Sequence, residues 1–162
     1  MARKGTDLLE GALRDLFGEL DAERWDHVAE NLDPDVELAD EITGEWLRGS
    51  HRVGAYLRAQ RGIVTEVRST IGSVSTSRLA DGLGLVTFTA GQRYRLGGAP
   101  RSETLSGSAI FAVNERGWKL RLLHLGEPSG ADEVESAVLD AGRSARPGAT
   151  LGESVRRVRA TR

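Results

Sequence analysis

The sequence contains no cysteine, which excludes disulfide bonds, thiolate nucleophiles and cysteine-ligated metal sites. No apolar run approaches the roughly 20 residues that a transmembrane helix requires. The first six residues carry two basic side chains and lead into an amphipathic segment, not into the apolar stretch of a signal peptide. We therefore expect a cytoplasmic protein that makes no contact with membranes.

Aromatic residues make up only 5% of the chain, and charge of neither sign is in large excess. The formal net charge of −2 gives no general attraction to nucleic acid or to a membrane surface. Hydrophobic residues amount to 39%, which is typical of a globular domain. Basic residues are 20 arginines and 2 lysines, a bias that suggests a GC-rich bacterial genome.

The first sixty residues show helical periodicity in three places. Apolar residues between Leu8 and Leu20 recur on one face of the first predicted helix. The second is short and ends at Asp33-Pro34, because proline disfavours the α conformation in the residue before it. The first and third predicted helices span residues 7–20 and 50–60. The second has its N-cap at Asp21 and apolar positions from Trp25 to Leu32, and a strand at 36–40 and a loop at 41–49 follow it.

The second half of the chain contains four runs rich in β-branched and aromatic residues, separated by turn signals such as Asp81-Gly82. Connections of hairpin length imply an antiparallel meander. Strands this long must twist and curve. We predict an α+β fold: a cone-shaped, curved antiparallel sheet with three N-terminal helices on its concave side. The runs are residues 65–78, 84–96, 103–114 and 118–126.

The last part of the chain has a different character, and we predict a domain over residues 1–127 and a helical or disordered extension over residues 128–162. Residues 143–162, here called the basic tail, hold six arginines and one glutamate, a net charge of +5. The rest of the chain therefore carries −7. The tail is either a solvated or disordered segment that touches its own acidic body, or a segment that recruits an acidic partner or nucleic acid. It contains no aromatic residue, which disfavours binding to single-stranded nucleic acid.

Four local motifs, in order, resemble the nuclear transport factor 2-like superfamily and its SnoaL-like, polyketide cyclase-like domains. They are Leu20-Asp-Ala-Glu-Arg-Trp25, Leu32-Asp-Pro-Asp-Val36, Leu47-Arg-Gly49 with Val53-Gly-Ala-Tyr-Leu57, and Gly117-Trp-Lys-Leu-Arg-Leu-Leu-His124. The resemblance covers about residues 7–127 and implies the cystatin-like cone. The superfamily includes isomerases, polyketide cyclases, dehydratases, epoxide hydrolases and non-catalytic dimeric adapters, so the fold does not select an activity.

Strand alternation suggests an acid–base pair. Asp40 shares a strand face with two apolar residues of the strand at 36–40, and it resembles the general-base aspartate of ketosteroid-isomerase-like members. His124 shares a face with Leu120 on the last strand, so both side chains would point inward. The alternatives are an Asp40 that ends its strand in water and a structural His124. His51, at the start of the third helix, is a third catalytic candidate or a support for that helix end.

Alternation on the strand at 84–96 also predicts a pocket wall, with two polar side chains at its mouth. For every residue of this set, the alternative is a place in the core or in a dimer interface. The predicted substrate-binding residues are Trp25, Trp46, Tyr56, Phe88, Gln92, Tyr94 and Trp118.

The sequence lacks the residues that several kinds of catalytic or metal site require. The isomerase members use two oxyanion donors, and the matching positions here are Leu16 and Ala109, which cannot donate. No G-x-S-x-G motif and no phosphate-binding glycine loop occurs. The three histidines lack metal-ligand spacing, and Asp33-x-Asp35-x-Glu37 lacks the glycine and the final acid of a calcium loop. We expect no metal and no cofactor.

Two functions remain. The first is a cofactor-independent cyclase, isomerase or hydrolase, in which Asp40 and His124 exchange protons with a hydrophobic, oxygenated small molecule. The second is a non-catalytic, homodimeric ligand-binding or adapter domain whose basic tail contacts an acidic partner. A homodimer is expected under both, because a partner subunit can cover the convex face of such a sheet.

Overall fold

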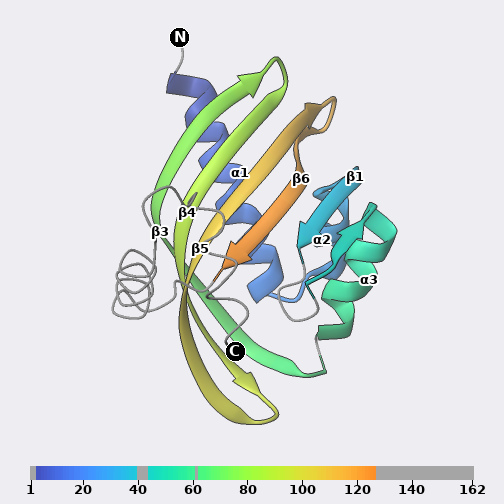
Figure 1. The fold of residues 1–162 in the computed structure, drawn as a ribbon, viewed down its shortest axis with the longest axis vertical. Coiled ribbons are helices and arrows are strands. Elements are labelled where there is room, and N and C mark those ends of the chain that lie inside the picture. The colour runs from blue at the N-terminus through green and yellow to red at the C-terminus, as the bar shows by residue number, and fades with distance from the viewer. Residues whose placement is uncertain (1–2, 40–43, 61, 127–162) are drawn as a thin grey trace, which may run out of the picture. The chain divides into compact units, whose positions relative to one another are not determined.

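The computed structural model describes residues 3–39, 44–60 and 62–126, which form three helices and one six-stranded sheet (Figure 1). Asp40 and the expected extension at 128–162 lie outside the described residues. The helices are α1 (Arg3–Asp21), α2 (Trp25–Glu30) and α3 (Ser50–Gln60). The strands are β1 (Leu32–Ala39), β2 (Trp46–Arg48), β3 (Val64–Ala80), β4 (Leu83–Leu96), β5 (Ala99–Asn114) and β6 (Gly117–Gly126).

The curved sheet has the strand order β2-β1-β6-β5-β4-β3, and the predicted fold class is confirmed (Figure 1). Strands β3 to β6 form the predicted antiparallel meander. The sheet is mixed, not antiparallel throughout, because β1 runs parallel to β6. The chain between β1 and β6 includes most of the domain. The two strands are therefore not linked by a short turn that would indicate their pairing in the sequence.

Two predicted boundaries near β1 were wrong. The second helix ends at Glu30, and Leu32 already pairs with Leu120 in the sheet. Residues 46–48, predicted as loop, form β2, in which Leu47 pairs with Leu38 and is buried. Three residues are too few to show a strand period, so only pairing defines this strand.

The core lies between α1 and the face of the sheet that α1 covers, here called the inner face. Leu9, Leu13, Leu16 and Phe17 of α1 are buried, as the periodicity predicts, whereas Leu8 is exposed. The ring of Phe17 meets the ring of Phe88 edge to face, with centroids 5.5 Å apart. Such a pair adds about 0.5–1.5 kcal/mol to the free energy gained by burial.

Two glycines allow large side chains to lie flat on the inner face. A Cβ atom on Gly107 would lie 2.4 Å from Cζ of Phe88, and one on Gly84 would lie 2.4 Å from Cδ1 of Leu9. Both distances are shorter than any van der Waals contact. The interior under α1 is therefore filled by side chains.

The C-terminal end of α1 is held on β3 by one carboxylate. The carboxylate of Asp21 accepts hydrogen bonds from the backbone N–H of Ser69, at 2.6 Å, and from its Oγ, at 2.8 Å. The site is partly buried, so losing the acceptor would leave two donors without a partner.

An extra residue in β6 changes which side chains face the core. Ile110 pairs with Leu122 and Phe111 with Leu120, so Arg121 has no partner on β5. Such a bulge moves all later side chains to the opposite face. The register between β1 and β6 shifts at the same place.

The guanidinium of Arg121 spans the bulge and donates hydrogen bonds to Asp33, at 2.8 Å, and to Asp35, at 2.9 Å. These two bonds, first the one to Asp33, raise the pKa of Arg121 above its usual value. The acidic pattern that the sequence offers as a calcium loop therefore binds a cation of the chain itself.

Replacing Gly107 by alanine should lower the free energy of unfolding by about 1–3 kcal/mol, because the Phe88 ring cannot move away while Phe17 packs on it. The matched control is Gly91→Ala on β4, where a Cβ atom meets nothing within 4 Å. Urea denaturation of both variants measures the difference. Equal stability of the two variants would contradict this packing.

Replacing Asp21 by alanine should cost about 1–3 kcal/mol of unfolding free energy, because it removes the acceptor for both donors of Ser69. Asp15→Ala, at an exposed position of the same helix, is the control and should leave stability within about 0.5 kcal/mol. Thermal and urea denaturation report both values. A stable Asp21→Ala protein would show that α1 is held without this carboxylate.

Candidate functional site

The predicted inward orientation of His124 is wrong. After the bulge at Arg121, Leu123 is buried opposite Ala109, and His124 is exposed opposite Ser108. Strict alternation from Leu120 predicts the reverse, because it assumes a strand without an insertion. His51 is exposed in the first turn of α3. Since Asp40 lies outside the described residues, its role stays a prediction.

The predicted substrate-binding residues occupy different environments. Phe88 belongs to the core, and Tyr56 and Trp118 pack against it while only partly buried. Trp46 lies on β2 with 44% of its surface exposed. The indole nitrogen of Trp25 is buried and has no hydrogen-bond partner among the described residues. The remaining two, Gln92 and Tyr94, have the half-buried polar positions that the mouth of a pocket requires.

On the inner face of β4 and β5, the side chains change from apolar to polar between one cross-strand pair and the next. Ala90 lies opposite Leu105, and both are buried. The next pair on this face is Gln92 opposite Glu103, followed by Tyr94. We call Gln92, Tyr94 and Glu103 the polar row.

Hydrogen bonds orient the side chains of the polar row. The amide Nε2 of Gln92 donates to Oγ of Ser69 at 3.0 Å, and Ser69 in turn donates to Asp21. The hydroxyl of Tyr94 donates to the carboxylate of Glu103 at 3.1 Å. An apolar wall that ends in oriented polar groups suits a small molecule with an apolar body and a polar end.

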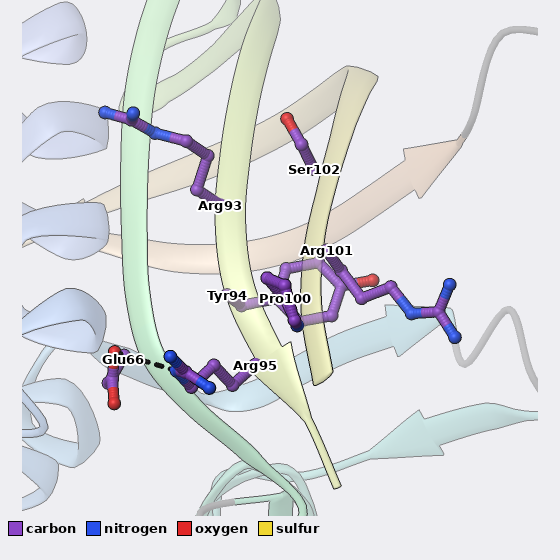
Figure 2. Close-up of a pocket in the computed structure, with 7 residues that line it drawn as sticks. All are labelled: Glu66, Arg93, Tyr94, Arg95, Pro100, Arg101 and Ser102. Atoms are coloured by element: carbon purple, nitrogen blue, oxygen red, sulfur yellow. Dashed lines mark hydrogen bonds and ion pairs between the residues drawn. The ribbon is translucent and has the colours of Figure 1, made fainter. Parts of the chain in front are cut away.

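Beyond the polar row, an open hollow of about 490 Å³ lies against the far part of the β4–β5 hairpin (Figure 2). The Nε atom of Arg95 donates to Glu66 at 3.2 Å, and its NH1 donates to the carbonyl of Gly98 at 2.6 Å. Sequence reasoning missed this hollow, although closely spaced arginines on either side of a Gly-Gly turn could have indicated it. Its lining residues are Glu66, Arg93, Tyr94, Arg95, Pro100, Arg101 and Ser102.

The outer face of the sheet, opposite α1, is uncharged near its middle. Thr87 lies opposite Ser108, which lies opposite His124. The rows on either side of this one contain only small or aliphatic residues across β4, β5 and β6. They are Leu85, Ile110 and Leu122 on one side, and Thr89, Ser106 and Gly126 on the other.

Other electrostatic features lie where α1 and α2 meet. The hydrogen bond from Arg24 lowers the pKa of Glu19, and the same bond raises the pKa of Arg24.

No three His, Asp or Glu side chains come together as metal ligands among the described residues. Within the same part of the chain, no helix has the length and apolarity to span a membrane.

No protein-family model matches the sequence, and no curated protein matches it. Solved structures do match. A protein with a cystatin-like fold from Caulobacter vibrioides has a TM-score of 0.71 at 17% identity, over 85% of this chain and 99% of that chain.

Two further structures are similar over most of the domain. A candidate dehydratase of the NTF2-like family from Streptomyces avermitilis has a TM-score of 0.73 at 14% identity, over 80% of this chain and all of that chain. A CaMKII hub from S. rosetta has a TM-score of 0.66 at 14% identity, over 76% of this chain and 96% of that chain. At such identities the likeness concerns the fold alone, and at that level it confirms the prediction: the chain has a cystatin-like fold.

Proposed function

We propose that this chain is a domain that binds a hydrophobic, oxygenated small molecule on the inner face of its sheet. The observation that carries the proposal is the step from the buried pair Ala90 and Leu105 to the polar row. A ligand there would lay its apolar body on the wall and direct its polar end to Gln92 and Tyr94.

Acid–base catalysis by a pair of Asp40 and His124 has less support. A pair of this kind needs both side chains at one cavity, within hydrogen-bond reach of the same substrate. His124 is exposed on the outer face, opposite Ser108, and Leu123 takes the inward position. We therefore favour binding without turnover by this pair.

The ligand should be visible in native mass spectrometry of the full-length protein as a discrete apolar adduct. Replacing Tyr94 by phenylalanine and Gln92 by leucine removes two polar contacts and should weaken retention about tenfold or more. The control, Thr87→Val on the outer face, should keep the adduct, and so should His124→Gln. A wild-type protein without an adduct, or a polar-row variant that keeps it, would count against the proposal.

A second proposed property is assembly into a homodimer through the outer face. The observation in its favour is the uncharged patch centred on Thr87, Ser108 and His124. A contact patch low in charge and rich in small side chains can be covered by a second copy at little desolvation cost. The similarity to a hub domain agrees with assembly as a use of this fold.

Replacing Ser108, at the centre of this patch, by arginine should prevent dimerisation. In Ser108→Arg, two like charges would meet near the symmetry axis, which costs several kcal/mol and should weaken association at least about 100-fold. Ala59→Arg, at an exposed position of α3, adds the same charge elsewhere and should leave the dimer intact. Light scattering after size-exclusion chromatography gives the masses. A monomeric wild type or a dimeric Ser108→Arg protein would exclude this interface.

The predicted contact between the basic tail and an acidic partner belongs to this proposal too. The tail lies outside the described residues, so its support is the charge of +5 alone.

A further inference from the structure

We propose that the small molecule bound on the inner face carries one carboxylate, and that Arg101 binds this carboxylate. The inference rests on the proposed function, because it names the charge of the same ligand. It adds one residue to the binding surface and gives the ligand a direction along the sheet.

The strand register places Arg101 on the inner face, directly after the polar row. Arg101 lies opposite Tyr94, which is two residues beyond Gln92 on β4, and side chains two residues apart on a strand share a face. Arg93 and Arg95 alternate with Tyr94 and therefore lie on the outer face. Figure 2 shows the same division: Tyr94 and Arg101 extend to one side of the hairpin, and the other two arginines extend to the opposite side.

The positive charge of Arg101 is not neutralised within the part of the chain that the structure describes. Its guanidinium forms no ion pair and no hydrogen bond with any described residue. The neighbouring acid on this face, Glu103, accepts a hydrogen bond from the hydroxyl of Tyr94 at 3.1 Å. The side chain of Arg101 can therefore bind an anion without first breaking a contact of its own.

The spacing between the apolar wall and Arg101 suits an amphiphilic molecule. Leu105 and Arg101 are four residues apart on β5, which is about 13 Å at the usual rise of a strand. Leu105 is buried together with Ala90, whereas Arg101 is exposed. A ligand with its apolar body on the wall would thus place its charged end at the border with water, where a carboxylate loses little of its hydration.

Two features of this end of the face favour a carboxylate over other charged groups. The planar guanidinium of an arginine can donate two parallel hydrogen bonds to the two oxygen atoms of a carboxylate. Glu103, two residues from Arg101 on the same face, would repel a phosphate with nearly two charges more strongly than a carboxylate with one. An amine would be repelled by Arg101 itself.

The test compares decanoate with decanol, two probes that share an apolar chain and differ in charge. Isothermal titration calorimetry with the full-length protein, below the critical micelle concentration of decanoate, measures both affinities. Arg101→Gln should weaken decanoate binding at least about fivefold, because it removes the charge-assisted hydrogen bonds, and should change decanol binding less than about twofold. Equal effects on the two probes, or no effect on decanoate, would overturn the assignment.

The matched control is Arg93→Gln. Arg93 is exposed, has no ion pair among the described residues and directly precedes Tyr94, but it lies on the outer face. This variant removes the same charge from the same hairpin and should change decanoate affinity less than about twofold. A loss as large as that in Arg101→Gln would show an effect of net charge alone, and the assignment would be wrong.

NMR spectroscopy gives a second readout at the guanidinium itself. The side-chain Nε–H signal of Arg101 is identified by its absence from the spectrum of Arg101→Gln. Titration with decanoate should shift this signal, and titration with decanol should shift it less. An Arg101 signal that does not move at saturating decanoate would contradict the proposal.

A third probe, decyl phosphate, decides the class of the anion. It should bind more weakly than decanoate, because Glu103 lies beside Arg101. Tighter binding of decyl phosphate than of decanoate, lost in Arg101→Gln, would overturn the choice of a carboxylate.

Failure of the proposed function is distinguishable from failure of this inference. If neither decanoate nor decanol binds, or if the double variant Tyr94→Phe, Gln92→Leu keeps full affinity for decanol, both the inner-face site and its charge assignment are wrong. If decanol binds and the double variant weakens it, but Arg101→Gln leaves decanoate binding unchanged, the site stands and only the role of Arg101 is wrong.

Discussion

The pairing of Arg121 with Asp33 and Asp35 determines how the two sides of this sheet are used. It lies where β6 carries one extra residue and where the register between β1 and β6 shifts. The pair with Asp35 is exposed and the pair with Asp33 is partly buried, so their importance lies in position more than in strength. Because Arg121 takes the extra place, Leu123 points into the core, and His124 joins the outer face.

This geometry separates three regions of the domain by their chemistry. Under α1 the inner face is filled, with Phe88 lying over Gly107 and held by Phe17. Beyond Ala90 and Leu105, the same face becomes polar, and there we propose that a small molecule binds. The outer face is uncharged at its middle, where we propose the contact with a second copy of the chain.

The length of the meander makes room for a fourth region. Strands β3, β4 and β5 have 17, 14 and 16 residues, longer than the usual strand of about 5–6. Their far ends extend past the buried core, as Figure 1 shows, so the arginines near the β4–β5 turn remain in solvent. There they can retain their charge without the desolvation cost that burial would impose.

Local patterns in the sequence determined much of this protein. The spacing of apolar residues specified α1 and α3, turn residues separated β3 to β6, and alternation on β4 put Gln92 and Tyr94 on the same face as Phe88. These features depend on neighbours along the chain, which a sequence displays directly. Only the tertiary structure decided the parallel pairing of β1 with β6, the short strand β2 and the outward side chain of His124. Each depends on a partner far away in the chain: a bulge at Arg121 exists only relative to the strands beside it, and one inserted residue reverses every face that alternation assigns after it.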